Sequence, residues 1–208
     1  MAGRPREFDR NAALALARNL FWKRGYEGVS MADLAQTLGL ASARIYAAFG
    51  SKEELFKAAI ELYEEQEGGF ADRAIAEELT VFSTLERMFD EAIRLYTRKQ
   101  NGNPLGCMVV SAATNCASEN TRIGQWLTEH RRARTASIVR HLKEAIRRGE
   151  LPKNTDAQSL GDLFATFLHG LSVQARDGVS RERLLATIPH LMSLLKVQIE
   201  QSEVTAAN

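Results

Sequence analysis

The sequence predicts an all-α protein, with an N-terminal three-helix unit followed by a larger α-helical part. The first observation is that apolar residues recur with the period of an α-helix along almost the whole chain. Between residues 8 and 24 they form adjacent i, i+4 rows: Ala12, Leu16 and Leu20, and Ala13, Ala17 and Phe21. The second is that no segment shows convincing period-2 alternation, and 4 Pro and 14 Gly in 208 residues leave little room for turn-dense β architecture.

The N-terminal helices are short and are delimited by residues with strong capping preferences. We expect helices over residues 8–24, 31–38, 42–49 and 51–63. Ser30 and Ser51 are natural N-caps, and Asp33 and Glu54 lie three residues later, where a carboxylate suits the first turn of a helix. Glycines end the first three helices: Gly25, Gly39 and Gly50.

Beyond residue 63 the expected helices are longer. They cover residues 83–99, 105–117, 121–148, 156–176 and 180–201, with a loop at residues 101–104. We place the domain boundary after residue 50. Residues 1–50 then form the N-terminal domain, and residues 51–208, which begin with a linking helix, form the second domain.

The pair of short helices between residues 28 and 52 has the arrangement of a helix-turn-helix. In this motif the first helix crosses the DNA backbone and supports the second helix in the major groove. Gly39 suits the tight joint, and Ala35 is small where the two helices approach each other. Apolar residues are expected to face the supporting helix: Val29, Leu34, Leu38, Ile45 and Phe49.

The second helix of this pair exposes a set of candidate DNA contacts. Arg44 can pair with a guanine edge or hold a phosphate, and Ala43 can touch a thymine methyl group. Ser42 and Tyr46 are suited to donate to phosphate oxygens. Lys52, in the first turn of the next helix, adds an ammonium group to the free amides of that helix and so favours a phosphate.

Arg4 and Arg6 precede the first helix as a basic arm that can reach the DNA backbone or a minor groove. Each of these features also has an ordinary structural explanation. A short helix pair with a glycine turn occurs in many bundles, Arg44 and Tyr46 can be surface residues, and the arm can be a solubilising tail.

Three stretches, residues 17–30, 31–40 and 43–56, together resemble the DNA-binding domain of the tetracycline-repressor (TetR) family of bacterial transcription regulators. The matching pattern is a Gly-Tyr pair, the helix-turn-helix, and then Tyr-x-x-Phe-x-x-Lys-x-x-Leu. The resemblance implies phosphate contacts from Ser30, Tyr46 and Lys52. It also implies base-side exposure of three residues: Ser42, Ala43 and Arg44.

The sequence departs from the usual family pattern at three positions. Ala41 stands where a serine commonly caps the recognition helix, Ala48 stands where His or Tyr is common, and Gly50 replaces a common proline. We therefore expect no side-chain cap on this helix and no phosphate contact from residue 48.

Residues 105–110, 149–151 and 167–178 resemble, more weakly, the C-terminal domains of one branch of the family. The resemblance implies a homodimer and a ligand-responsive regulator. In such a protein the dimer binds a palindromic DNA operator, usually as a repressor, and a small-molecule inducer releases it. On this view ligand binding shifts the helix that begins at residue 51, and the two recognition helices separate.

A two-fold dimer is also expected because a single helix-turn-helix reads few base pairs. The last two long helices each carry an apolar face, and two such pairs can form a four-helix bundle. The predicted interface residues are Leu160, Phe164, Phe167, Leu171, Leu184, Ile188, Leu191 and Leu195. The alternative is that these faces are buried only within the chain.

The ligand pocket is expected between residues 83 and 176, where polar or aromatic residues interrupt apolar faces. The candidates are Phe89, Tyr96, Asn115, Trp126, His130, Arg134, His169 and Gln174. Ordinary core or interface packing is the alternative for each of them. His130 and Arg134 lie one turn apart, so that together they can hold an anion or else form part of a charged surface.

Cys107 and Cys116 are expected to be reduced thiols in a cytoplasmic protein, since no signal segment or long apolar run is present. A redox- or metal-responsive regulator that uses them is the alternative function. No nucleophile, phosphate-loop or zinc motif is recognisable, and the four histidines lack metal-ligand spacing. We therefore expect neither an enzyme nor a cofactor or metal site, and no membrane partner.

The net charge of +1 conceals an uneven distribution. Residues 1–60 contain nine Lys and Arg against six Asp and Glu, whereas the remainder contains eighteen against twenty. The basic excess lies in the DNA-binding part, but it is small. The sequence therefore predicts few phosphate contacts and a shallow salt dependence of DNA binding.

Overall fold

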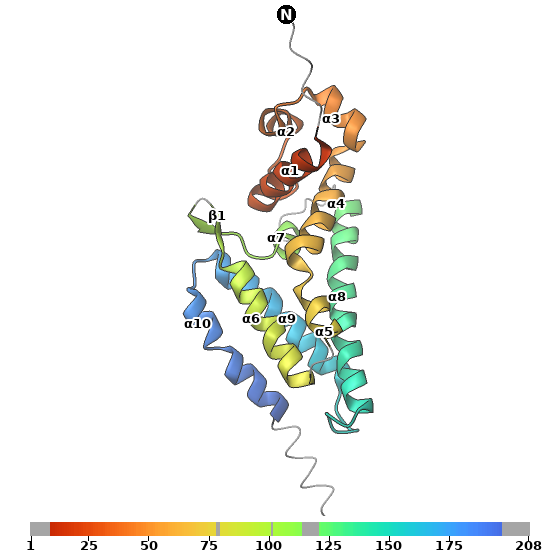
Figure 1. The fold of residues 1–208 in the computed structure, drawn as a ribbon, viewed down its shortest axis with the longest axis vertical. Helices are drawn as coiled ribbons and strands as arrows, with labels where there is room; N and C mark the ends of the chain where they lie inside the picture. Colours follow the sequence, from red (N-terminus) through yellow and green to blue (C-terminus); the bar gives the residue numbers. More distant parts are fainter. Residues whose placement is uncertain (1–8, 78–79, 101, 114–120, 197–208) are drawn as a thin grey trace, which may run out of the picture.

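The computed structural model describes residues 9–77, 80–100, 102–113 and 121–196, and these are almost entirely helical, as predicted (Figure 1). The helices are α1 (Arg10–Arg24), α2 (Met31–Leu38), α3 (Ser42–Phe49), α4 (Lys52–Tyr63), a π-helix η1 (Glu64–Gly68), α5 (Phe70–Ala76), α6 (Val81–Tyr96), α7 (Met108–Ala113), α8 (Thr121–Arg147), α9 (Ala157–Arg176) and α10 (Arg181–Leu185). Helices α1 to α3 gather at one end of the elongated molecule. Helix α4 runs from them along α8 (Figure 1).

Local capping explains why the N-terminal helices begin where they do. Asp9 caps α1, because its Oδ1 accepts from the amides of Asn11 and Ala12 at 3.0 Å. Ser30 and Ser51 each form the expected capping box with the acidic residue three positions later. As the sequence indicates, Ala41 gives α3 no side-chain cap.

An aromatic cluster holds the N-terminal helices against α4. The ring of Phe56 lies edge-on to those of Phe21 and Tyr26, at 5.1 Å between centroids in each pair. Ile45 and Phe49 are the buried residues of α3, and they face the core as predicted. This core fixes the orientation of α3, and so determines which of its side chains face outward.

Several boundaries differ from the expectation. A two-residue antiparallel pair, β1 (Lys99–Gln100) with β2 (Asn103–Pro104), brackets the predicted loop. Helix α5 is separate, because η1 interrupts the helical register before it. The last helix breaks at residues 186–187 and resumes over 188–196. Pro189 lies in the first turn after this break, where the missing N–H of proline is tolerated.

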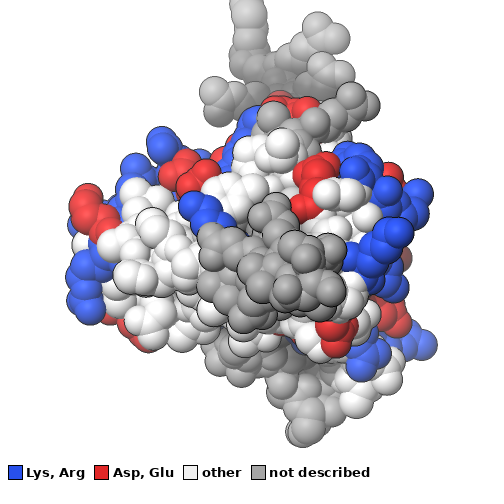
Figure 2. All heavy atoms as spheres, turned by 90° about the horizontal axis from the view of Figure 1, so that it is seen from below, with Lys and Arg blue, Asp and Glu red and all other residues white. Residues whose placement is uncertain are grey.

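The surface at the end of the molecule away from α1–α3 carries interspersed acidic and basic side chains, with basic ones gathered on the side of α8 (Figure 2). The exposed basic residues of α8 include Arg132, Arg140, Lys143 and Arg147. Among the described residues, no helix is long and apolar enough to cross a membrane.

Candidate nucleic-acid interface and ligand-domain cleft

The outer face of α3 carries the residues predicted to read DNA. Ala43, Arg44 and Tyr46 are exposed, Tyr46 by 49%, and Ser42 is half-buried. The buried side of the helix is apolar, so these side chains are directed away from the core. The exposure that the prediction requires is therefore present. Arg4 and Arg6 lie outside the described residues.

Arg10 is a cation near α3 that the sequence analysis did not single out. Its Nε donates to the carbonyl oxygen of Ala48 at 3.3 Å, and its guanidinium lies 4.9 Å from the centroid of the Phe49 ring. A cation at the C-terminal end of a helix interacts favourably with the helix dipole. Arg10 thus places a positive charge beside residue 48, whose alanine side chain has no donor of its own.

The ammonium group of Lys52 lies 4.2 Å from the centroid of the Tyr26 ring. Partial burial lowers the pKa of Lys52, and the nearby carboxylates of Glu27 and Asp33 oppose this shift. Because the side chain is half-buried at the first turn of α4, its position is restricted. The phosphate contact that the sequence predicts for this residue stays a prediction.

Ser30 is engaged within its own helix. Its Oγ accepts from the amide of Asp33 at 3.1 Å and donates to Asp33 Oδ2 at 2.5 Å. Arg24 donates to the other oxygen of this carboxylate at 2.8 Å. The hydrogen bonds from Ser30, with that from Arg24, lower the pKa of Asp33 from 3.8 to about 2. A phosphate contact from the Ser30 hydroxyl would therefore have to displace a bond to Asp33.

The predicted ligand-pocket residues do not all come together. Phe89 is fully buried and packs edge-on against Phe164 at 5.7 Å and Phe167 at 5.4 Å. Gln174 is exposed and lines a groove between α9 and α10. Phe89 is therefore a core residue and Gln174 belongs to another surface, while Asn115 lies outside the described residues.

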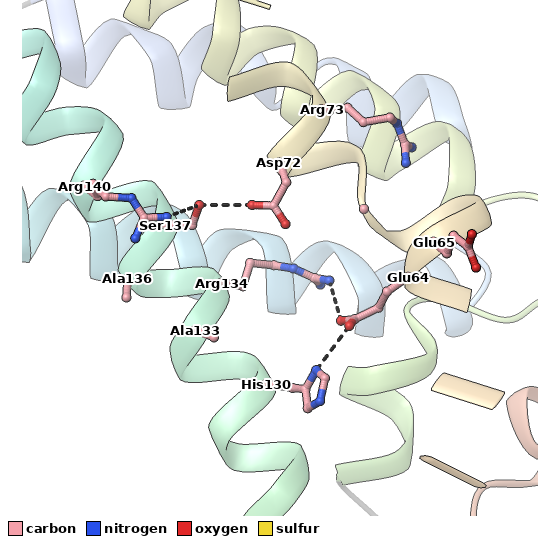
Figure 3. Close-up of a pocket in the computed structure, with 11 residues that line it drawn as sticks. Glu64, Glu65, Asp72, Arg73, His130, Ala133, Arg134, Ala136, Ser137 and Arg140 are labelled. Carbon is pink, nitrogen blue, oxygen red and sulfur yellow. Dashed lines mark hydrogen bonds and ion pairs between the residues drawn. The ribbon is translucent and has the colours of Figure 1, made fainter. Parts of the chain in front are cut away.

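Trp126, His130 and Arg134 do form a group on α8. The rings of Trp126 and His130 lie 4.0 Å apart. His130 Nδ1 and Arg134 Nη2 both bond to the carboxylate of Glu64 in η1, each at 3.1 Å (Figure 3). Burial alone would raise the pKa of Glu64, but the hydrogen bond from His130 and the charge of Arg134 outweigh it and lower the pKa.

This group lies beside a cleft of about 770 Å³ between α8 and the segment formed by η1 and α5. The lining residues are Glu64, Glu65, Gly69, Asp72, Arg73, His130, Ala133, Arg134, Ala136, Ser137 and Arg140. Figure 3 shows Asp72 directed toward Ser137, which donates to it at 3.0 Å. Glu64 was not among the predicted site residues, because its partners are 66 and 70 positions away in the sequence.

Cys107 is buried behind this group. The hydroxyl of Tyr63 donates to its Sγ at 3.6 Å, and Arg134 Nη1 lies 3.9 Å from the same atom. Burial is the main reason why the pKa values of the Tyr63 and Tyr96 hydroxyls lie well above that of a free tyrosine. Burial acts to lower the pKa of Arg134, but its neighbours Cys107, Tyr96, Tyr63 and Glu64 raise it overall.

His169, on α9, is half-buried on the same side of the domain. Burial first, and then the charges of Arg131 and Arg134, lower its pKa. Tyr96 is buried against Phe70 at 6.0 Å. Tyr96 therefore lies near Cys107 and His169 lies near Arg134, and neither residue lines the cleft.

The segment before α7 also contacts the N-terminal helices directly. The indole Nε1 of Trp22, in α1, donates to the carbonyl oxygen of Gly106 at 3.1 Å. The Trp22 ring lies edge-on to Tyr63 at 4.8 Å. The amide of Cys107 donates to Ser172 Oγ, in α9, at 2.8 Å. The thiol, helix α1 and helix α9 therefore meet at this segment.

The apolar faces of the last helices contribute to the core of the chain's own C-terminal part. Seven of the eight predicted dimer-interface residues are buried within the chain, and Phe167 is half-buried. The reason is that α9 and the segment over residues 184–195 complete the core of their own domain. In the described part of these helices, the large apolar side chains that remain exposed are Leu163, Val173 and Leu194.

Cys116 is outside the described residues, so the structure gives no relation between the two thiols. Among the described residues, no group of three or more His, Cys, Asp or Glu side chains could hold a metal ion.

The fold and the exposed face of α3 define a helix-turn-helix DNA-binding protein, and the comparisons identify its family. A family model described as "Bacterial regulatory proteins, tetR family" matches residues 13–59. A second, described as "Tetracyclin repressor-like, C-terminal domain", matches residues 81–176.

Two similar proteins of Escherichia coli (strain K12) are described as HTH-type transcriptional repressors. ComR is 32% identical over 184 residues, which cover 88% of this chain and 87% of ComR. BdcR is 31% identical over 199 residues, which cover 96% and 95% of the two chains.

A solved structure extends the comparison. A cysteine mutant of the TetR family transcriptional regulator CifR, in complex with 26-bp double-strand operator DNA, is 35% identical with a TM-score of 0.84. The match covers 92% of this chain and 98% of the CifR chain. The protein belongs to the TetR family and is a transcriptional regulator.

Proposed function

We propose that the protein is a ligand-responsive repressor that binds a palindromic operator as a homodimer and is released by a small-molecule inducer. The observation that carries this proposal is the exposed face of α3, which presents Arg44 and Tyr46, followed in the chain by the half-buried Lys52 at the first turn of α4. The repressor role is supported by the names of two relatives. In this proposal residues 1–50 bind DNA and residues 51–208 bind ligand and partner.

The proposed dimer surface is the outward face of α9 and the adjoining groove. Leu163 and Val173, on α9, are exposed by 40% and 44%, and the groove between them and α10 would extend this apolar surface. The groove, of about 460 Å³, is lined by residues of α9, of α10 and of the segments beside α10, among them Thr166, Gly170 and Thr187. These small, uncharged residues would allow close approach of a second α9.

The proposed ligand response uses α4, which begins directly after the DNA-binding residues 1–50 and ends at η1. Glu64 and Glu67 of η1 connect this end to other helices: Glu64 to Arg134 of α8, and Glu67 to Arg18 of α1. A ligand that binds one arrangement of η1 more tightly than another will shift the population of that arrangement. The spacing of the two recognition helices will change with it.

We propose that the chain acts by binding alone, with no catalytic step and no cofactor, in the cytoplasm where bacterial DNA lies. TetR-family regulators are DNA-binding proteins as a class.

A gel shift with the DNA upstream of the chain's own gene, at several salt concentrations, tests the proposal. The double variant Tyr46→Phe, Lys52→Ala should lose salt-dependent affinity, because it removes one phosphate donor and one cation. Lys143→Ala is the matched control, since Lys143 is exposed on α8. Unchanged binding of the double variant would contradict the proposed contacts.

The surroundings of Cys107 favour a second candidate, a thiol-based redox or metal response. The thiol is buried, with the Tyr63 hydroxyl 3.6 Å and Arg134 Nη1 3.9 Å from its Sγ, so a chemical change at the sulfur would disturb both partners. Cys107→Ser should then abolish the response to the inducing agent while operator binding persists. If Cys107→Ser and Cys116→Ser both respond normally, this candidate fails.

A further inference from the structure

Two donors on α8 converge on one carboxylate. His130 Nδ1 bonds to Glu64 Oε2, and Arg134 Nη2 bonds to Glu64 Oε1, each at 3.1 Å. Each carboxylate oxygen thus meets its own donor, which is the geometry that recognises a planar carboxylate. The carboxylate of Glu64 therefore stands where an external carboxylate would bind if it displaced this side chain.

The cleft in front of this subsite has room for a small molecule. It measures about 770 Å³, and small residues line it at Gly69, Ala133 and Ala136. Figure 3 shows the side chain of Arg134 reaching across it from α8 toward Glu64. An incoming group can therefore approach His130 and Arg134 from the solvent side.

Two further cations lie at the edge of the cleft. Arg73 Nη2 donates to the carbonyl oxygen of Glu67 at 3.3 Å, and Arg140 Nη2 donates to Ser137 Oγ at 3.2 Å. Within the described part of the chain, neither guanidinium lies within 4.0 Å of a carboxylate oxygen. Both can therefore attract an anion to the cleft.

The acidic residues of the cleft limit the charge of that anion. Glu65 and Asp72 also line it, and Asp72 accepts from Ser137 at 3.0 Å. Each additional negative charge on a ligand would meet these carboxylates, so a monocarboxylate fits better than phosphate or a diacid.

We propose that this cleft binds an organic monocarboxylate, which displaces Glu64 from His130 and Arg134. The inference rests on the proposed ligand response, and it names the chemical class of the ligand. Glu64 belongs to a π-helix, a rare element that is often found at functional sites. Release of its carboxylate frees the end of α4, the helix that joins the cleft to the recognition domain.

Calorimetric titration of the full-length protein with benzoate, and with benzamide as the neutral isostere, tests the proposal. Wild type should bind benzoate and not benzamide. Glu64→Gln should bind benzoate about tenfold more tightly, because the internal competitor has lost its charge. Arg140→Gln should bind it several-fold more weakly. Arg132→Gln, on the same helix and exposed outside the cleft, should match wild type.

Equal affinity for benzoate and benzamide, or a Glu64→Gln affinity that is unchanged or lower, overturns the inference. Absence of benzoate binding in both wild type and Glu64→Gln overturns it as well. Glu64→Asp is the folding control: it keeps the charge but shortens the side chain, so its benzoate affinity should lie between the other two. Operator binding is measured on the same samples. If the wild type binds the operator but not benzoate, only this inference fails. If the wild type does not bind the operator, the proposed function is contradicted.

Discussion

Replacement of Trp22 by Phe tests the contact between α1 and the segment before α7. Trp22 is 4% exposed, and its indole donates to the buried carbonyl of Gly106 at 3.1 Å. Phenylalanine preserves an aromatic ring near Tyr63 but removes the donor. An unsatisfied buried acceptor costs about 1–3 kcal/mol, and the smaller ring adds about 1 kcal/mol of lost packing. We therefore expect a loss of about 2–4 kcal/mol, a large share of the roughly 5–15 kcal/mol of a typical domain.

Urea unfolding followed by far-UV circular dichroism measures this loss without depending on tryptophan fluorescence. Protein concentration must be held constant, because association contributes to the stability of a dimer. The control is Trp126→Phe, at a half-buried indole on α8, for which we expect about 1 kcal/mol or less. If Trp22→Phe costs no more than Trp126→Phe, the Trp22–Gly106 bond does not stabilise this contact.

Three further predictions concern the backbone and caps. Gly106→Ala should cost about 3 kcal/mol or more and Gly149→Ala only about 1 kcal/mol in urea unfolding. Both glycines have positive φ, so both substitutions strain the backbone. A Cβ at Gly106 would also lie 2.7 Å from the carbonyl oxygen of Ser172, whereas a Cβ at Gly149 would meet nothing within 4 Å. Equal losses of stability for the two variants would refute this reasoning. Ser51→Ala should cost about 1 kcal/mol through loss of the α4 capping box, and an unchanged urea midpoint would speak against it. The lowered pKa of Asp33 means that its stabilisation is present above pH 3.8 and is lost as the pH falls through about 2. Asp33→Asn should therefore lower the Tm at pH 6 and have little effect near pH 2, and a deficit that persists at pH 2 would be inconsistent with this shift.

The recognition domain could be predicted almost completely because its determinants are local. The capping box of Ser30 with Asp33 fixes the start of α2, and Gly39 and Gly50 end α2 and α3 where the sequence predicts. The outward face of α3 then follows from its period, since Ile45 and Phe49 must face inward. The contact of Arg10 with Ala48 is not local, and no sequence pattern indicated it.

The C-terminal domain was less predictable, because an apolar face does not indicate which surface will cover it. The periodicity identified Leu160, Leu184 and Leu195 as apolar positions, but it could not distinguish a partner subunit from the chain's own core. Similarly, the spacing of His130 and Arg134 suggested an anion site. That Glu64 supplies the carboxylate depends on tertiary packing of η1 against α8.

The central claim is that the exposed face of α3 reads operator DNA. Fluorescence anisotropy with the DNA upstream of the chain's own gene, and with a scrambled duplex of equal length, tests it most directly in wild type, Arg44→Ala and Arg132→Ala. If Arg44 contacts a base, Arg44→Ala should lose about 1–3 kcal/mol of preference for the upstream DNA, while Arg132→Ala keeps the wild-type preference. Wild-type binding that shows no preference, or an Arg44→Ala variant whose affinity and preference are unchanged, would contradict the account.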